Sequence, residues 1–159
     1  MDHHRKDLRL KNYDYRWNGA YFITITCQGR EPFFAYSPPV QEIFQFAFAS
    51  IEKKYPYCQV LEKVIMPDHL HFILLFSGDD SLEERKSLST IIQEFKSLVT
   101  RAFIEKVKAG QLPAFHEKIW QKGFYEHVIR GEEEVYQVRK YIQENPLKLA
   151  LLQEEWKKK

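Results

Sequence analysis

Hydrophobic residues recur at helical spacing in two long segments of the chain. In residues 40–55 the apolar positions fall on one helical face, and Pro56 ends the pattern because proline cannot continue a helix. The second segment begins at Ser87 or Ser89 and keeps the same spacing as far as Lys108. Both segments are therefore predicted to be helices.

Four shorter segments are rich in β-branched and aromatic residues, as strands are. They cover residues 21–27, 58–66, 69–76 and 124–130. Pro67 and Asp68 join the second to the third and predict a hairpin, and a short helical pattern over 132–144 follows the fourth. The order β-α-β-β-α-β-α matches an α+β, ferredoxin-like split βαβ unit, in which two helices cover one face of an antiparallel sheet. In this topology the first and third strands are central, and the other face is left for a site.

Length and composition fit one domain over residues 1–159, with 44% hydrophobic content. No apolar run approaches the ~20 residues that cross a bilayer, and no signal peptide precedes Leu8. We therefore expect a cytoplasmic protein without a membrane partner. Cys27 and Cys58 lie in strand-like segments without metal spacing, which predicts buried thiols rather than a disulfide.

The formal net charge of +2 excludes no class of partner, but the cations gather at the two ends. An N-terminal arm (residues 1–16) and a C-terminal tail (residues 147–159) are both basic. They carry Arg5, Lys6, Arg9, Lys11, Arg16, Lys157, Lys158 and Lys159. Such ends are usually solvated, although arms that also hold aromatic side chains suit nucleic-acid backbones and bases.

Two histidines lie in the segment that otherwise resembles a buried strand. His69 and His71 are two positions apart, so on a strand their side chains project from the same face. This arrangement suits two ligands of one metal ion. The alternative is a histidine pair satisfied by hydrogen bonds or water, and a His-x-His motif alone does not decide between the two.

The short helix near the C-terminus supplies candidate partners for the histidines. Tyr141 and Asn145 are four positions apart and share one helical face. Pro146 disfavours helical geometry at Asn145, so its amide oxygen is expected at the helix end, where it can turn toward a metal. The alternatives are an ordinary aromatic residue and a helix-terminating Asn-Pro pair, and Tyr136 competes with Tyr141 for any special role.

Three motifs, in this order, carry a resemblance to a known family: MPDHLH (residues 66–71), FYEHVIR (124–130) and YIQENPLK (141–148). The first resembles the histidine-hydrophobe-histidine motif of the HUH endonucleases. The other two resemble the C-terminal signature of the single-tyrosine transposases, a group that includes small insertion-sequence transposases and the REP-associated tyrosine transposases of bacteria. The resemblance extends from about Trp17 to Leu152.

The resemblance implies an enzyme in which His69 and His71 bind metal, Tyr141 is the nucleophile and Asn145 is a further ligand. It implies Mg²⁺ or Mn²⁺, whereas two imidazoles alone would favour zinc or another late transition metal. Tyr141 would attack single-stranded DNA, often folded into a hairpin, and form a 5′-phosphotyrosine with a free 3′-hydroxyl. Attack by another 3′-hydroxyl would rejoin the DNA.

Several basic and aromatic residues are candidate DNA contacts, although each also fits an ordinary surface position. They are Arg16, Trp17, Arg30, Lys122 and Arg130. Many REP-associated members carry a Gly-Thr-x-Trp-like segment before the first strand, with which they read a short guide sequence. Here residues 18–21 are Asn-Gly-Ala-Tyr, so no target sequence follows from that subgroup.

Two other classes of function remain open. One is a non-catalytic module that binds structured nucleic acid, and the other is a metal-dependent hydrolase that uses water. Tyr141 separates them, because only the transposase forms a covalent link between protein and DNA. The chain is expected to act as a monomer or a homodimer, with a weak preference for a site completed within one chain.

Overall fold

The computed structural model describes residues 13–79 and 81–158. Most of the predicted basic arm, including Arg5, Lys6, Arg9 and Lys11, lies outside these residues. The elements are β1 (Gly19–Thr26), η1 (Gln28–Arg30), α2 (Pro38–Lys54), β2 (Cys58–Met66), β3 (His69–Phe76), η2 (Leu82–Glu84), α3 (Leu88–Lys108), β4 (Tyr125–Ile129), α4 (Gly131–Glu144) and α5 (Pro146–Lys158).

The strands form a four-stranded sheet with the order β2-β3-β1-β4. Every neighbouring pair is antiparallel, and β1 and β3 are the two central strands. The predicted α+β, ferredoxin-like topology is confirmed. The predicted strand ends are correct to within two residues.

Two serines begin the helices that cover the first face of the sheet. The Ser37 hydroxyl accepts from the backbone N–H of Val40 at the start of α2, and the Ser87 hydroxyl accepts from Thr90 at the start of α3. Ser87 rather than Ser89 is therefore the cap of α3. The helices then pack aromatic side chains of α2 and α3 against β3, with Phe48 and Phe72 5.1 Å apart between ring centroids.

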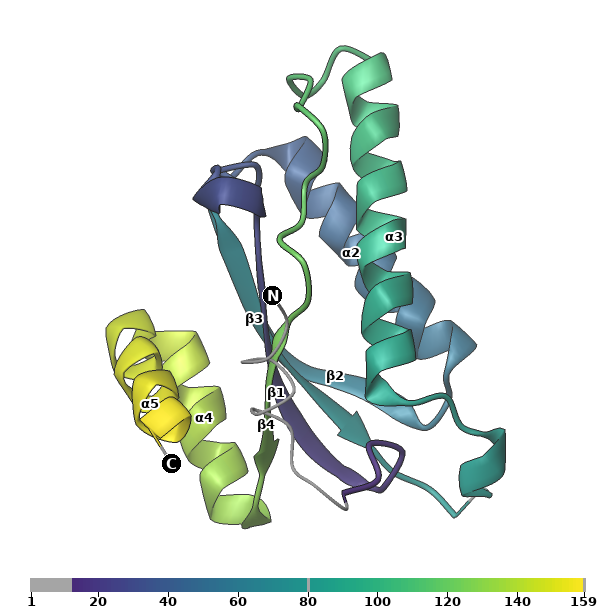
Figure 1. Cartoon of the computed structure of the whole chain (residues 1–159), viewed down its shortest axis with the longest axis vertical. Coiled ribbons are helices and arrows are strands. Elements are labelled where there is room, and N and C mark those ends of the chain that lie inside the picture. Colours follow the sequence, from purple (N-terminus) through teal and green to yellow (C-terminus); the bar gives the residue numbers. More distant parts are fainter. Residues whose placement is uncertain (1–12, 80, 159) are drawn as a thin grey trace.

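The second face of the sheet is covered as well, by α4 and α5 (Figure 1). Sequence analysis predicted one helix after the fourth strand and left this face of the sheet for the site. It described residues 147–159 as a tail, whereas the structure has helix α5 over nearly all of this segment. The buried residues of this second core are Ala20, Phe22, Ile73, Ile129, Val138, Ile142 and Leu149.

Burial on both faces explains why Tyr21, Phe22 and Ile23 are consecutive apolar residues in β1. Tyr21 and Ile23 belong to the core under α2 and α3, while Phe22 between them belongs to the core under α4 and α5. All three side chains are fully buried. None of the described helices has a long enough apolar stretch to cross a membrane.

Candidate active site

His69 and His71 lie side by side on β3, as the strand period predicts. Their ring centroids are 4.8 Å apart, and the ring planes meet at 74°. Both side chains project toward the face covered by α4 and α5, because the residues between and beyond them, Leu70 and Phe72, belong to the opposite core. The structure therefore brings two imidazoles within reach of one small ion.

Each ring is held at its Nδ1 edge by an oxygen. His69 Nδ1 donates to Asp68 Oδ1 at 2.6 Å, and His71 Nδ1 lies 2.8 Å from the Thr24 hydroxyl oxygen on β1. Metal-binding histidines commonly use one nitrogen for the ion and give the other to a carboxylate, carbonyl or hydroxyl. The hydrogen bonds at Nδ1 leave Nε2 as the nitrogen of each ring that could bind a metal.

His71 is buried and uncharged. Its ring stacks on Phe22, with centroids 5.4 Å apart. Burial is the main cause that lowers the pKa of His71 to about 3, and the neighbouring His69 and Lys157 lower it further. The imidazole therefore keeps a free lone pair at neutral pH, as a metal ligand requires.

Asp68 connects His69 to a residue from another part of the chain. Its second oxygen pairs with Arg30 Nε at 2.9 Å. The hydrogen bond from His69 is the main cause that lowers the pKa of Asp68, and the charge of Arg30 adds to it. Arg30 has a left-handed backbone, with φ of 58°, at the end of η1. The predicted DNA contact Arg30 thus lies beside the histidine pair.

The histidine pair fits a divalent ion as two ligands of an incomplete set. In the part of the chain that the structure describes, no group of three or more His, Cys, Asp and Glu side chains is arranged to hold a metal. Further ligands would have to come from an amide such as Asn145, from water or from a substrate phosphate. An open position of this kind is what a catalytic metal needs.

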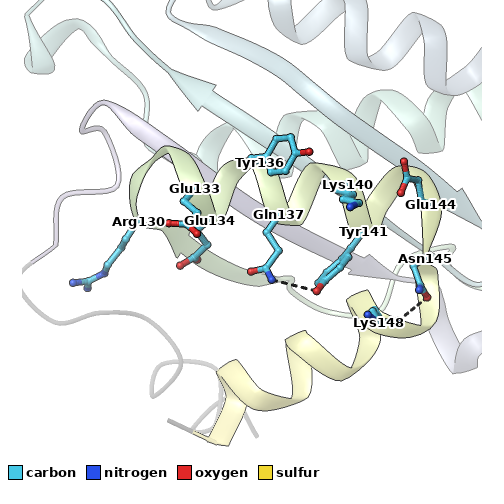
Figure 2. A pocket seen from close by; sticks show the side chains of 10 residues that line it. All are labelled: Arg130, Glu133, Glu134, Tyr136, Gln137, Lys140, Tyr141, Glu144, Asn145 and Lys148. Atoms are coloured by element: carbon cyan, nitrogen blue, oxygen red, sulfur yellow. Dashed lines mark hydrogen bonds between the residues drawn. The ribbon is translucent and has the colours of Figure 1, made fainter.

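Tyr141 lies on α4 in a groove of about 730 Å³ (Figure 2). Its hydroxyl oxygen accepts from Gln137 Nε2 at 3.2 Å, and the Lys148 ammonium is 5.8 Å from its ring centre. The groove is lined by both cations and carboxylates. These are Arg130, Lys140, Lys148, Glu133, Glu134 and Glu144.

Asn145 occupies the boundary between α4 and α5. Its backbone N–H donates to Tyr141 O at the end of α4, and its side-chain oxygen accepts from Lys148 N at 3.1 Å at the start of α5. This is the helix-boundary alternative considered above, and it leaves the amide oxygen one further lone pair. Among residues 13–79 and 81–158, no hydrogen bond joins Tyr141 or Asn145 to the histidine pair, and their metal and nucleophile roles stay predictions.

Helix α5 covers the strands next to the histidines. Trp156 stacks on His127 of β4 at 3.7 Å between centroids, and His127 Nε2 lies 2.6 Å from Glu134 of α4. Gln153 of the same helix donates to the Thr24 hydroxyl at 3.1 Å. Sequence analysis missed Thr24, Asp68 and Gln153 as neighbours of the site. Of the three, only Asp68 could have been found from the sequence, because it is a carboxylate directly before the first histidine.

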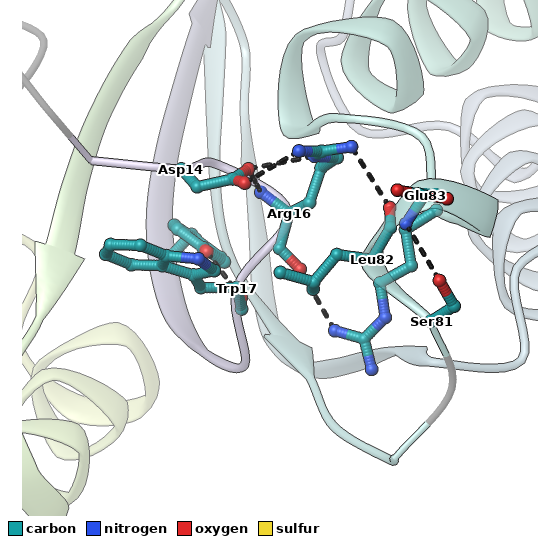
Figure 3. Close-up of polar contacts among 8 residues, drawn as sticks. Asp14, Arg16, Trp17, Ser81, Leu82 and Glu83 are labelled. Atoms are coloured by element: carbon teal, nitrogen blue, oxygen red, sulfur yellow. Dashed lines mark hydrogen bonds and ion pairs between the residues drawn. The ribbon is translucent and has the colours of Figure 1, made fainter.

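The remaining predicted DNA contacts lie at separate places on the surface. Arg16 is held by Asp14 at 2.8 Å and by the carbonyl of Leu82, and Trp17 beside it is 42% exposed (Figure 3). Lys122 and Arg130 are exposed, the latter at the Tyr141 groove. Their role in binding DNA stays a prediction.

Two proteins of Haemophilus influenzae are similar to this chain in sequence. An uncharacterized protein of Haemophilus influenzae is 32% identical over 161 residues, which covers 91% of this chain and 89% of that protein. A second Haemophilus influenzae protein, whose name assigns it to the REP-associated tyrosine transposases, is 29% identical over 145 residues and covers 87% of this chain and 77% of that protein.

Solved structures share the fold. A REP-associated tyrosine transposase bound to a REP hairpin aligns with a TM-score of 0.60 at 22% identity, over 88% of this chain and 73% of that one. A Deinococcus radiodurans protein named as a transposase aligns with a TM-score of 0.53 at 13% identity, over 86% of this chain and 96% of that one. The family model described as "Transposase IS200 like" matches residues 15–145, which include the histidine pair and Tyr141. The chain therefore belongs to the IS200-like transposase family.

Proposed function

We propose that this transposase cleaves single-stranded DNA in a metal-dependent reaction and transfers the cut strand through a 5′-phosphotyrosine on Tyr141. The observation that carries the proposal is the histidine pair. His69 and His71 are adjacent, and the Nδ1 edge of each is held by Asp68 or Thr24 so that Nε2 is left for a metal. In a chain of the IS200-like transposase family, a metal site of this kind would serve DNA strand transfer.

His69 and His71 would hold Mg²⁺ or Mn²⁺ through their Nε2 atoms, with Asn145 as the expected third protein ligand. When bound, the ion supplies positive charge beside the scissile phosphate, which stabilises the charge that develops on its oxygens and on the leaving group. The pKa of about 3 at His71 means that proton binding does not compete for its lone pair at neutral pH.

Tyr141 would supply the nucleophile. A phenol ordinarily has a pKa near ~10, so its proton must leave as Oη attacks phosphorus. The Oη–P bond forms, the bond from phosphorus to the 3′-oxygen breaks, and that oxygen leaves as a 3′-hydroxyl after taking up a proton. Gln137 Nε2 donates to Tyr141 Oη, and the Lys148 ammonium lies 5.8 Å from the ring centre, so the chain itself places two groups beside the attacking atom.

The substrate we propose is a single strand folded into a hairpin. The similar solved transposase is bound to a REP hairpin, and this chain has exposed groups that suit such a ligand. Arg130, Lys140 and Lys148 line the groove that holds Tyr141, where they can pair with phosphates. Trp17 is exposed and can stack on an unpaired base.

The test is the covalent intermediate. The protein is incubated with a single-stranded hairpin DNA and Mn²⁺, denatured, digested and examined by mass spectrometry. We expect a peptide that carries a 5′-phosphodeoxynucleotide on Tyr141. Replacing Tyr141 by Phe removes one oxygen, so the Tyr141→Phe protein should still bind the hairpin but form no adduct.

Tyr136 provides the matched control, because it lies on the same helix and lines the same groove, yet is 68% exposed. Tyr136→Phe should form the adduct at the wild-type rate. Cleavage by Tyr141→Phe at the wild-type rate would make water the nucleophile and would favour the hydrolase. Hairpin binding without cleavage by the wild-type protein in Mg²⁺ or Mn²⁺ would favour the non-catalytic binding module.

A further inference from the structure

A chain of buried polar side chains links helix α5 to the histidine pair. Among the described residues, five polar or charged side chains are buried, and three of these form consecutive hydrogen bonds. Gln153 Nε2 donates to Thr24 Oγ1 at 3.1 Å, and Thr24 Oγ1 lies 2.8 Å from His71 Nδ1. The chain begins on the last helix, crosses β1 and ends on β3.

Packing alone does not explain Gln153. Its helix neighbour Leu149, one turn earlier, is fully buried in the core shared with α4 and the sheet. A leucine at position 153 would match this apolar surface, whereas a buried amide loses free energy unless its hydrogen bonds are made. The hydrogen bond to Thr24, rather than packing, therefore accounts for the amide of Gln153.

The hydroxyl oxygen of Thr24 has two lone pairs. Gln153 donates to one of them, and the other is available to an N–H on Nδ1 of His71. With its proton on Nδ1, the neutral His71 ring keeps the lone pair on Nε2, which is the atom that faces away from Thr24. With Gln153 on one lone pair, the Thr24 oxygen still has a lone pair for the Nδ1 N–H of His71, and the Gln153 hydrogen bond fixes where that oxygen lies.

From this arrangement we infer that Gln153 is a positioning residue for His71, acting through Thr24. It holds the Thr24 oxygen in place, which fixes the orientation of the His71 ring that rests against this oxygen. Helix α5 thereby becomes part of the active site although it contributes no metal ligand. The inference rests on the proposed role of His71 as a ligand of Mg²⁺ or Mn²⁺.

The first test measures Mn²⁺ affinity without DNA, by electron paramagnetic resonance of the unbound ion. Gln153→Leu and Gln153→Met keep the apolar bulk and remove the amide, and we expect each to weaken Mn²⁺ binding about 10- to 100-fold, as loss of an outer-shell partner does. Circular dichroism with thermal unfolding verifies the fold of both. Gln143→Leu is the matched control, because Gln143 donates to Glu62 on the surface and should leave Mn²⁺ affinity unchanged.

The second test asks whether the effect passes through Thr24. Thr24→Val should weaken Mn²⁺ binding by a similar factor, and adding Gln153→Leu to it should weaken binding no further. Nitrogen-15 NMR of His71 should show one sharp set of ring resonances in the metal-free wild type and shifted or broadened resonances in Gln153→Leu, whose ring is held less firmly. This readout does not change if Gln153 merely supports the fold.

Three outcomes would overturn the inference: unchanged Mn²⁺ affinity in Gln153→Leu and Gln153→Met, tighter binding in these variants, or an equal further loss in the Thr24→Val background. His71→Ala separates this failure from failure of the proposed function. Wild-type Mn²⁺ affinity in His71→Ala would mean that the histidine pair is not the Mn²⁺ site, which contradicts the proposed function. Loss of affinity in His71→Ala but not in the Gln153 variants would remove only the role of Gln153.

Discussion

Asp68 contacts two residues that sequence analysis treated as unrelated, His69 and Arg30. One oxygen fixes the ring of His69, and the other orients a guanidinium whose side chain is largely exposed. A phosphate next to the histidine pair would meet this guanidinium. The carboxylate therefore orients both His69, a proposed metal ligand, and Arg30, a proposed DNA contact.

Asp68→Ala should weaken Mn²⁺ binding about 10- to 100-fold, because His69 loses the acceptor that holds its Nδ1 edge. Titration of Mn²⁺ without DNA measures this effect. Asp14→Ala is the matched control, since Asp14 also pairs with an arginine, Arg16, but makes no contact with a histidine. An equal loss of affinity in the two variants would show that Asp68 acts through general charge rather than through His69.

Sequence analysis found the residues whose geometry depends on local spacing and missed those that tertiary contact brings in. A period of two places His69 and His71 on one face whatever the rest of the fold does. Gln153 lies 129 positions from Thr24, and no local pattern predicts that the two meet. Asn145 was considered both as a ligand and as a helix boundary, and the structure shows the second arrangement.

Helix α5 was missed for reasons that lie in its own sequence. Pro146 was treated as the end of a helix, but proline also suits the first turn of a helix, and here it begins one. The apolar residues of α5 do not follow one narrow face, since Leu147 and Leu151 are exposed while Leu149 is buried. A pattern search therefore finds a weak helix, and packing against α4 and the sheet determines the structure.

The buried side of α5 should carry most of its stabilising effect. Leu149→Ala is expected to lower the free energy of unfolding by about 2–5 kcal/mol, because it removes buried methyl groups and leaves a cavity. Leu151, 60% exposed on the same helix, gives the control, and its change to Ala should cost less than about 0.5 kcal/mol. Urea unfolding followed by circular dichroism compares the two, and equal losses would mean that α5 is not packed as described.

In the whole molecule, the tyrosine helix lies on the sheet of its own chain. Arg139 and Gln143 of α4 both donate to Glu62 on β2, and Val138 and Ile142 are buried in the second core. These contacts hold Tyr141 over the same sheet that carries the histidines. They favour an active site completed within one chain over one completed by exchange of helices between subunits.

Mixing two inactive variants tests this assignment. One chain carries Tyr141→Phe and the other carries His71→Ala, and cleavage of hairpin DNA is followed over time. We expect no activity beyond that of the separate variants, because neither chain holds both the nucleophile and the complete histidine pair. Restored cleavage, up to about a quarter of the wild-type level for randomly mixed dimers, would mean that α4 acts on a partner subunit.

Hydrophobic periodicity predicted the order of the elements from β1 to α4. It did not predict that α4 and α5 form a helical layer that covers the second face of the sheet. The unbroken apolar run of Tyr21, Phe22 and Ile23 was already a sign that this part of β1 is buried on both faces. Such a run predicts a strand, and it also implies that a second layer covers the other face of the sheet. In structural terms, the apolar surface of Phe22 and Ile73 required α4 and α5.

The way in which α5 is held has a consequence for how order is lost. A helix that contacts a sheet mainly through its side chains opens locally at lower free energy than the central strands of the sheet, and it does so as a cooperative unit. Gln153, Trp156 and Leu149 belong to one such unit, so its opening removes the Gln153–Thr24 hydrogen bond while the sheet stays folded. On warming, the site is expected to lose its preorganised histidine before the domain unfolds, so the working temperature range of the enzyme would be set by its last helix.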